Sequence, residues 1–131
     1  KDIDTSSIQT VTTDDDSEED TVTATFKKRL VSRLNYTKES EDVYSNKFNE
    51  NESYRIDFAN KTFTYSNRSI TYVYSWKGDN GSLGACQYDF VNNSQTSTCE
   101  DSTVDFIKKT KLFLQMELYY CGLSLEKLQA E

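Results

Sequence analysis

Four short runs between residues 54 and 90 alternate aromatic or aliphatic residues with polar ones. A period of two residues is typical of a strand that buries one face and exposes the other. The runs cover 54–58, 62–65, 70–76 and 86–90, and short polar breaks separate them. The break at 78–81 contains Asn80-Gly81, a strong signal for a tight hairpin. Four such strands with short links predict an antiparallel meander.

The segments on either side of this meander carry helix patterns. In residues 18–34 an apolar residue recurs every four positions, and Ser17 with Asp20 forms a capping box at the start. In residues 103–121 an apolar stripe lies on one helix face and consists of Val104, Ile107, Leu114, Leu118 and Cys121. The sequence therefore predicts an α+β fold with an N-terminal helix, a four-stranded antiparallel meander and a C-terminal helix packed on the sheet.

Both helix predictions have an alternative, because the same segments also show the alternation of strands. The alternating residues are Val22, Ala24 and Phe26 in the first segment, and Leu112, Leu114, Met116 and Leu118 in the second. If both segments were strands, the chain would be an all-β barrel or sandwich. A lipocalin-like barrel with an aromatic interior would then sequester a small apolar or amine ligand.

The negative charge is concentrated at one end of the chain. Residues 1–20 contain eight of the 22 acids and one of the 15 bases, which accounts for the whole net charge of −7. A segment with so few apolar residues cannot offset the entropy lost on ordering it. We therefore expect 1–17 to be a disordered acidic arm and 18–131 to form one globular, glycosylated domain. Such an arm would either keep the chain in solution or speed association with a basic partner.

Composition excludes several functional classes. The chain has no His, which removes Ser-His and Cys-His catalysis and His-ligated metals. Its acidity argues against nucleic-acid binding, and it has no run of 18 apolar residues that would predict a membrane span. No spacing brings two carboxylates together for acid–base chemistry. We expect no enzymatic activity, no catalytic residue, no metal site and no cofactor.

Six N-x-S/T sequons are the strongest indication of where the protein resides. With nine Asn and 30 Ser or Thr among 131 residues, chance would give about two sequons. The six are Asn35, Asn51, Asn60, Asn67, Asn80 and Asn92, each in or beside a predicted turn or loop. They predict a secreted or extracellular N-glycoprotein whose signal peptide has been removed.

Successive turns of a meander alternate between the two ends of its sheet. We therefore expect Asn60 and Asn80 at one end, and Asn51, Asn67 and Asn92 at the other. Glycans would then shield both ends, and binding would be left to the open sheet face, a sheet edge or the helices.

Three Cys residues fit an oxidising compartment but leave one without a partner. The pairings 86–99, 86–121 and 99–121 are all open. Cys86 shares a strand face with Tyr88 and Phe90, while Cys121 lies on the apolar stripe of the second helix. We favour a bridge between Cys86 and Cys121, with 86–99 close behind. The third Cys would be free or would link two chains in a disulfide-bonded dimer.

The aromatic content indicates a contact surface. The chain has nine Tyr, seven Phe and one Trp, more than one small sheet face can bury, and Tyr is frequent in binding hot spots. The residues expected at this surface are Tyr36, Tyr44, Tyr54 and Tyr119. The sequence predicts a secreted binding protein with an extracellular protein partner, either a basic cytokine or chemokine or a host receptor. The lipocalin-like carrier is the alternative.

Overall fold

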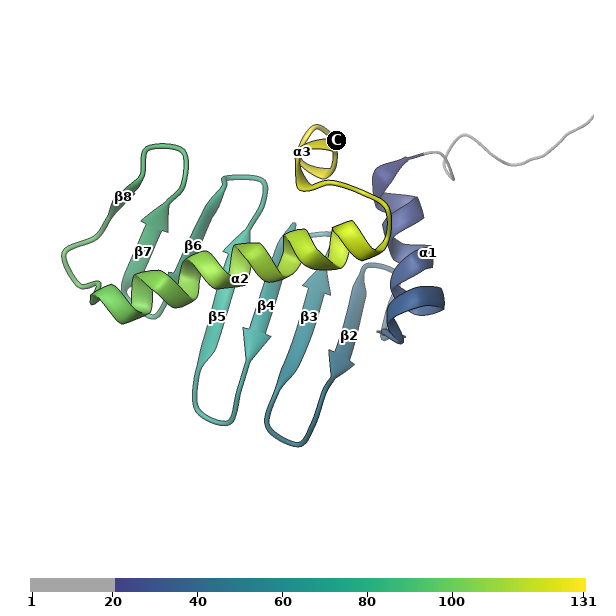
Figure 1. Cartoon of the computed structure of the whole chain (residues 1–131), viewed down its shortest axis with the longest axis horizontal. Helices are drawn as coiled ribbons and strands as arrows, with labels where there is room; N and C mark the ends of the chain where they lie inside the picture. The colour runs from purple at the N-terminus through teal and green to yellow at the C-terminus, as the bar shows by residue number, and fades with distance from the viewer. Residues whose placement is uncertain (1–20) are drawn as a thin grey trace, which may run out of the picture.

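The computed structural model describes residues 21–131, and the predicted acidic arm at 1–17 lies outside them. Within this part of the chain, three helices accompany one sheet: α1 (Val22–Leu34), α2 (Asp101–Tyr120) and α3 (Leu125–Gln129). Helix α2 crosses one face of the sheet, and α1 and α3 lie beside its C-terminal half (Figure 1). The fold is α+β, as predicted.

The sheet is an eight-stranded antiparallel meander in which each strand pairs with its neighbours in the sequence. The strands are β1 (Thr37–Lys38), β2 (Val43–Lys47), β3 (Ser53–Asp57), β4 (Thr62–Ser66), β5 (Thr71–Ser75), β6 (Asn80–Leu83), β7 (Cys86–Asp89) and β8 (Ser94–Gln95). The predicted strands correspond to β3, β4, β5 and β7. The prediction of four strands is therefore wrong in number, although the antiparallel meander itself is confirmed.

The four strands absent from the prediction lack aromatic alternation. Strands β1 and β8 have two residues each and form the edges of the sheet. Strand β2 places one aromatic residue, Tyr44, on the covered face. Strand β6 buries Gly81, where a Cβ would lie 2.4 Å from Ile107 Cγ2 of α2. The helix approaches the backbone of β6 closely, so the fully buried position of this strand holds no large apolar side chain to reveal it.

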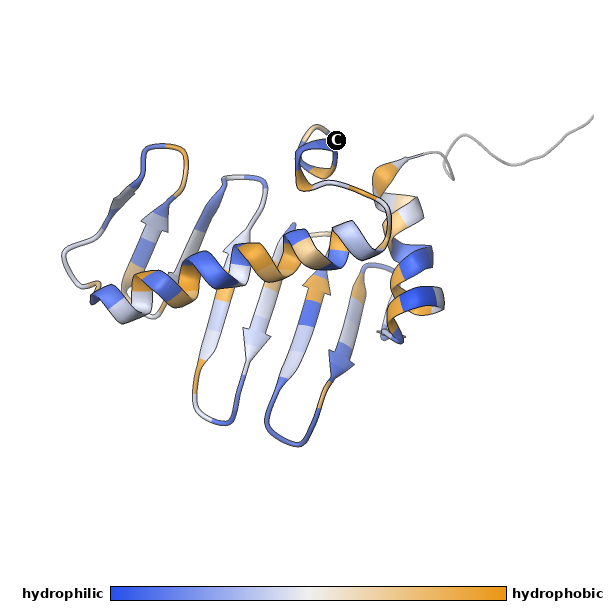
Figure 2. Ribbon diagram, in the orientation of Figure 1, coloured by the Kyte–Doolittle hydropathy of each residue, from blue (hydrophilic) through white to orange (hydrophobic). Residues whose placement is uncertain are grey.

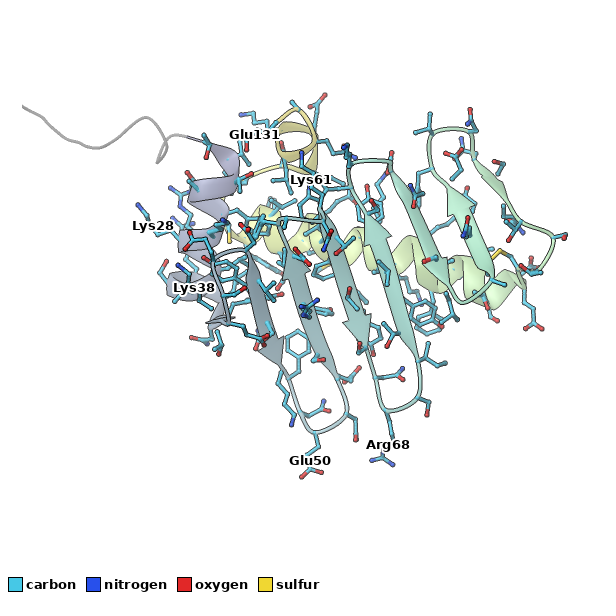
Figure 3. All side chains as sticks on the ribbon, turned by 180° about the vertical axis from the view of Figure 1, so that it is seen from behind. Lys28, Lys38, Glu50, Lys61, Arg68 and Glu131 are labelled. Atoms are coloured by element: carbon cyan, nitrogen blue, oxygen red, sulfur yellow. A yellow bond between two sulfur atoms is a disulfide. The ribbon has the colours of Figure 1, made fainter. Side chains whose placement is uncertain are left out.

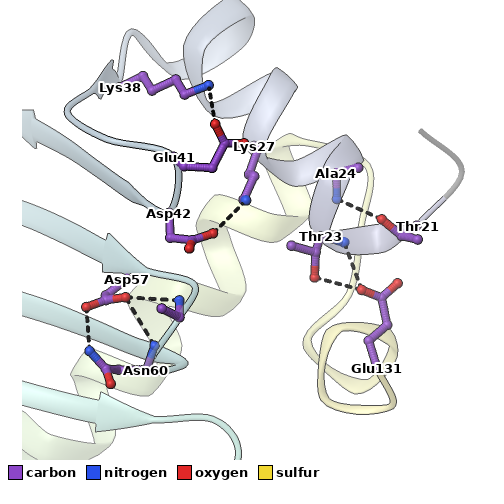
Figure 4. Close-up of polar contacts among 11 residues, drawn as sticks. Thr21, Thr23, Ala24, Lys27, Lys38, Glu41, Asp42, Asp57, Asn60 and Glu131 are labelled. Carbon is purple, nitrogen blue, oxygen red and sulfur yellow. Dashed lines mark hydrogen bonds and ion pairs between the residues drawn. The ribbon is translucent and has the colours of Figure 1, made fainter. Parts of the chain in front are cut away.

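Both predicted helices are present. Helix α1 begins later than the predicted 18–34, because Thr21 caps it by accepting a hydrogen bond from the Ala24 N–H (Figure 4). Helix α2 begins and ends within two residues of the predicted 103–121. Apolar and polar residues alternate along α2 (Figure 2), and the predicted stripe is its buried face. Both segments are therefore helices and not strands.

Helix α3 fastens the C-terminal part of the described chain to α1 and to the sheet. Its buried face consists of Leu125 and Leu128. The Glu131 carboxylate accepts hydrogen bonds from the Thr23 N–H at 3.0 Å and from the Thr23 hydroxyl at 2.7 Å (Figure 4). Gln129 donates to the Trp76 carbonyl at 3.0 Å. Thus α3 satisfies donors at the start of α1 and holds α1 against the end of the sheet.

Aromatic side chains fill the space between α2 and the sheet. The Tyr54 ring lies 5.1 Å from Phe63 and 5.6 Å from Phe113 of α2, measured between centroids. Phe63 and Tyr74 are fully buried. The sheet is not closed, and β1 and β8 remain at opposite edges (Figure 1). The barrel or sandwich alternative is therefore wrong, because a helix covers the aromatic face.

The disulfide joins Cys86 to Cys99 and not Cys86 to Cys121. Cys86 packs with the residues around Ile107 in the N-terminal half of α2, whereas Cys121 packs with α1 and Leu118. A helix of 20 residues is about 30 Å long, so these two cysteines lie at opposite ends of α2. Cys121 is the free cysteine and is fully buried, so the folded chain does not present its thiol to a second molecule.

Candidate interaction surface

The outer face of α2 carries apolar side chains that no other part of residues 21–131 covers. Leu112, Met116, Tyr119 and Tyr120 are exposed, Tyr119 to 76%. Met116 follows Leu112 by four residues and Tyr119 follows by three more, the spacing with which one helix packs on another. We call these four residues the α2 stripe. Surface helices usually turn polar residues outward, so such a stripe indicates a contact surface.

The side chains of the α2 stripe are suited to protein recognition. The Tyr119 and Tyr120 rings meet edge to face, with centroids 5.9 Å apart. Tyrosine supplies large contact area and a polar group with few rotatable bonds, and it is frequent in hot spots. Met116 is flexible and polarisable, and therefore adapts to irregular partner surfaces.

The α2 stripe continues into a groove of about 360 Å³ between α2 and α3. The groove is lined by Tyr119, Gly122, Leu123, Ser124 and Lys127. Gly122 ends α2 with a φ of +74°, a left-handed conformation that other residues rarely adopt. A side chain there would also crowd Arg29, because a Cβ would lie 3.4 Å from its Nη1 atom.

Two arginines of α1 hold the C-terminal end of α2 in place. Arg29 Nη1 donates to the Cys121 carbonyl at 2.8 Å, and Arg33 Nη1 donates to the Tyr120 carbonyl at 3.5 Å. Helix α2 has no basic residue in its own last turn. The guanidinium groups therefore supply the positive charge and the donors that a helix C-terminus favours.

A partly buried hydrogen bond joins α2, beside the α2 stripe, to the chain that follows α1. The Tyr36 hydroxyl donates to Glu117 Oε2 at 2.6 Å. Burial raises the pKa of the Glu117 carboxyl, and the bond from Tyr36 opposes only part of this effect. Burial and the nearby charge of Glu117 hold the pKa of Tyr36 well above its usual range. Tyr36 therefore stays a neutral donor and ties the chain after α1 to α2.

Of the four tyrosines predicted as exposed contact residues, Tyr119 alone is strongly exposed. Tyr36 and Tyr44 are buried and Tyr54 is half-buried, so their expected exposure is wrong. All three face the helical layer. The Tyr44 ring, for example, lies 5.8 Å from Phe58 between centroids. These rings are part of the packing between the sheet and the helices.

Sequence reasoning missed three members of the α2 stripe. Leu112 and Met116 belong to the alternative strand pattern of the sequence, and Tyr120 was not predicted as a contact residue. The signal was nevertheless readable: Leu112, Met116 and Tyr119 have helical spacing on the face opposite Leu114 and Leu118.

The opposite face of the sheet is polar, and no helix in the described part of the chain covers it (Figure 3). Its side chains form three rows across the strands. The rows are Thr37, Ser45, Arg55, Thr64, Val73, Ser82 and Gln87; then Val43, Asp57, Thr62, Ser75, Asn80, Asp89 and Ser94; and then Lys47, Ser53, Ser66 and Thr71. Short hydroxyl side chains dominate, and no aromatic residue is present. This open face therefore lacks the anchors typical of a protein interface.

Five of the six sequons flank this open face. Asn51 and Asn67 lie in the β2–β3 and β4–β5 turns, at one end of the sheet. Asn60 and Asn92 lie in the β3–β4 and β7–β8 turns at the other end, where Asn80 begins β6. Asn92 therefore joins Asn60 and Asn80, contrary to prediction, because β6 reverses the chain once more before β7. No sequon follows Asn92, so none lies on α2 or α3.

Two of these sequons lie in turns with the same pattern and the same hydrogen bonds. In the first turn, Asp57 accepts from the N–H groups of Ala59 and Asn60, and from the Asn60 side-chain nitrogen at 2.8 Å (Figure 4). Asp89 binds Asn92 at 2.8 Å in the same way. The repeated pattern Asp-Phe-x-Asn-x-Thr/Ser was not recognised in the sequence. The β3–β4 turn and the β7–β8 turn are therefore held by the same set of hydrogen bonds.

Among residues 21–131 there is no cluster of three potential metal ligands. Within the same range, no helix combines the length and hydrophobicity needed to cross a bilayer. The free cysteine and the carboxylates with shifted pKa values are all engaged in packing, caps or turns. Comparison of the chain with protein-family models, with curated proteins and with solved structures finds no match.

Proposed function

We propose that the protein is a secreted N-glycosylated binding protein whose extracellular protein partner docks on the α2 stripe. The observation that carries this proposal is the separation of the two faces. The helical face has exposed Leu112, Met116, Tyr119 and Tyr120 and no sequon on α2 or α3, whereas five sequons flank the polar open face. Glycans on those five sites would leave the outer face of α2 as the accessible apolar surface, and the sixth sequon, Asn35, lies at the C-terminal end of α1.

The basic character of the partner is supported by charge outside the described structure. Residues 1–20 hold the whole net charge of −7. Helix α1, by contrast, has four basic residues and no acidic one, so the flank of the α2 stripe does not itself attract a basic protein. The acidic segment would act on the association rate, and raised salt would slow association without moving the docking site.

The test uses an array of extracellular domains, cytokines and chemokines, probed with the glycosylated protein. The stripe variant combines Leu112→Arg with Tyr119→Ser, and the matched control is Thr71→Arg on the open face. We expect the wild type and the control to bind the same target. The stripe variant should lose affinity by more than about tenfold, because it removes central apolar contacts.

Circular dichroism on all three proteins checks that the substitutions leave the fold intact. The proposal fails if binding survives in the stripe variant and is lost in the control, because the open face would then be the interface. It also fails if mapping of the secreted protein finds most of the six sequons unoccupied, because the open face would then be unshielded.

A further inference from the structure

A second concave surface lies on the open face, over β6, β7 and β8. It is a hollow of about 450 Å³, lined by Gly78, Asn80, Gln87, Tyr88, Asp89, Ser94, Gln95 and Thr96. The side chains of Gln87 and Ser94 belong to the open face, are exposed and have no hydrogen-bond partner within residues 21–131. Asp89 is the one charged member, and its carboxylate is engaged in the β7–β8 turn. Free amides and hydroxyls without an apolar anchor suit a neutral, polyhydroxylated ligand.

The side chain of Asn80 reaches this hollow with its nitrogen against Gly78. Asn80 is exposed on the open face, between Ser75 of β5 and Asp89 of β7. A Cβ on residue 78 would lie 2.4 Å from Asn80 Nδ2. Because residue 78 is a glycine, the Asn80 nitrogen can occupy this space. Nδ2 is the atom to which an N-linked sugar is attached. A glycan on the Asn80 sequon therefore starts at the wall of the hollow.

The other sequons in the described part of the chain lack this combination. The Nδ2 atoms of Asn60 and Asn92 are hydrogen-bonded to aspartates in their own turns. Asn51 and Asn67 border a different hollow, whose lining includes the charged residues Glu50, Glu52 and Arg68. Asn80 alone among these sequons has both features: its Nδ2 atom makes no hydrogen bond, and its side chain borders a hollow with unpartnered amide and hydroxyl groups.

We propose that the first N-acetylglucosamine of the Asn80 glycan occupies this hollow and bonds to Gln87 and Ser94. The inference rests on the glycosylation part of the proposed function. In the attachment step, a lipid-linked diphosphate donor forms the bond between sugar C1 and Nδ2. Nδ2 loses one proton, and the lipid diphosphate leaves. The tether then holds the sugar at a high effective concentration, so individually weak hydrogen bonds suffice.

The occupied hollow would protect one of the two edges of the sheet. Strand β8 has two residues, both exposed, and it is an edge strand. Such an edge offers unpaired backbone groups to other chains. A sugar that contacts both β6 and β8 would connect the edge strand to an inner strand of the sheet. It would also shield the exposed backbone groups of β8.

The test compares two serine substitutions that each remove one sequon. Ser82→Ala abolishes the Asn80 sequon but leaves Asn80 and the hollow intact, and Ser69→Ala does the same for Asn67. Each variant is made in glycosylating cells and in bacteria, beside the wild type. We expect Ser82→Ala to lower the midpoint of thermal unfolding of the glycosylated protein by about 4 °C. Ser69→Ala should leave it unchanged, and the two bacterial variants should not differ.

Two further measurements locate the effect. Trimming every glycan to one N-acetylglucosamine with an endoglycosidase should preserve the difference, because only the first sugar is in the hollow. Gln87→Ala should lower the midpoint of the glycosylated wild type but not that of the Ser82→Ala variant. Hydrogen exchange of residues 86–95 should be slower in the glycosylated wild type than in the Ser82→Ala variant.

Three results overturn the inference: an unoccupied Asn80, equal midpoints for the two serine variants, or loss of the effect on trimming. None of these measurements involves a partner. A failure here therefore leaves docking on the α2 stripe standing, and failure of that docking leaves the Asn80 result standing.

Discussion

At the scale of single residues, the aspartate clamps on Asn60 and Asn92 distinguish these sequons chemically. Burial acts to raise the pKa of Asp57, but hydrogen bonds from Asn60 and Ala59 outweigh it and lower the pKa. The Asp57 carboxylate therefore depends on the donor at position 60. The same dependence links Asp89 to Asn92, because that amide also lowers the pKa of its aspartate.

In the unglycosylated protein, Asn60→Asp replaces this donor with a second carboxylate close to Asp57. We expect a loss of about 1 kcal/mol of unfolding free energy at pH 7, from repulsion at the surface and the lost hydrogen bond. One of the two groups is protonated below about pH 4, so the repulsive part of the loss should disappear there. Urea unfolding at pH 7 and pH 4 measures both values.

Asn67→Asp is the matched control for this substitution. Asn67 Oδ1 accepts hydrogen bonds from the N–H groups of Ser69 and Ile70, which a carboxylate accepts equally well. Its stability at pH 7 should stay within about 0.5 kcal/mol of the wild type. Equal losses in both variants would show that the clamp at Asp57 is not the cause.

Glu117 gives a pH dependence of the opposite sign. Burial raises the pKa of its carboxyl in the folded state, so the folded chain binds this proton more tightly than the unfolded chain. The charged carboxylate therefore reduces stability above its folded pKa, and this reduction vanishes below its unfolded value near pH 4.5. In Glu117→Gln the amide oxygen still accepts from Tyr36. This variant should equal or exceed the wild type in stability at pH 7, and any advantage should shrink toward pH 4.5.

Urea unfolding between pH 4.5 and pH 8 measures this dependence, and Glu117→Leu provides the contrast. The leucine leaves the buried Tyr36 hydroxyl without an acceptor, which costs about 1–3 kcal/mol at every pH in this range. A Glu117→Gln variant as unstable as Glu117→Leu would mean that the charge, and not the hydrogen bond, holds Tyr36.

At the scale of secondary-structure elements, the contact between α2 and β6 tolerates no side chain on Gly81. A Cβ there would lie 2.4 Å from Ile107 Cγ2, and Ile107 is fully buried. We expect Gly81→Ala to cost about 2 kcal/mol, because α2 must move away from the sheet. Ser82→Ala, one residue further and on the open face, should cost less than about 0.5 kcal/mol in unglycosylated protein. Adding Ile107→Ala to Gly81→Ala should cost less than the two single losses combined.

The same contact explains which elements were predictable from the sequence. Strands β3, β4, β5 and β7 alternate large aromatic and polar residues, and both long helices have apolar stripes with helical spacing. Strand β6 could not be recognised, because its buried position holds a glycine whose role depends on Ile107 of α2, 26 positions later in the chain. Tyr44 was expected at the surface for a related reason, since β2 has no second aromatic residue to indicate a covered face.

At the scale of the whole molecule, the number of strands decides where the sequons lie. Each added strand reverses the chain, so the unpredicted β6 moved Asn92 to the end of the sheet that holds Asn60 and Asn80. All three then border the open face, and α2 remains clear of sequons. The α2 stripe was therefore only partly predictable. Tyr119 was identified by composition, whereas the separation of the two faces depends on the full strand order.

The reactivity of the Cys121 thiol measures how often the packing between α1, α2 and the sheet opens. Cys121 is fully buried where α1, α2 and the sheet meet, and burial together with the charge of Glu117 raises the pKa of its thiol. A thiol reagent should therefore label Cys121 in the native protein more than about 1,000-fold more slowly than in urea, at a rate that follows unfolding.

Leu30→Ala weakens the packing of α1 and should accelerate this labelling, because the opened state becomes more populated. Mass spectrometry of the labelled protein, with the 86–99 disulfide intact, measures the rate. Native labelling as fast as in urea would mean that α1 separates from α2 without global unfolding. The thiol would then be available to a second chain, and a disulfide-linked dimer through Cys121 would become the expected form of the protein under oxidising conditions.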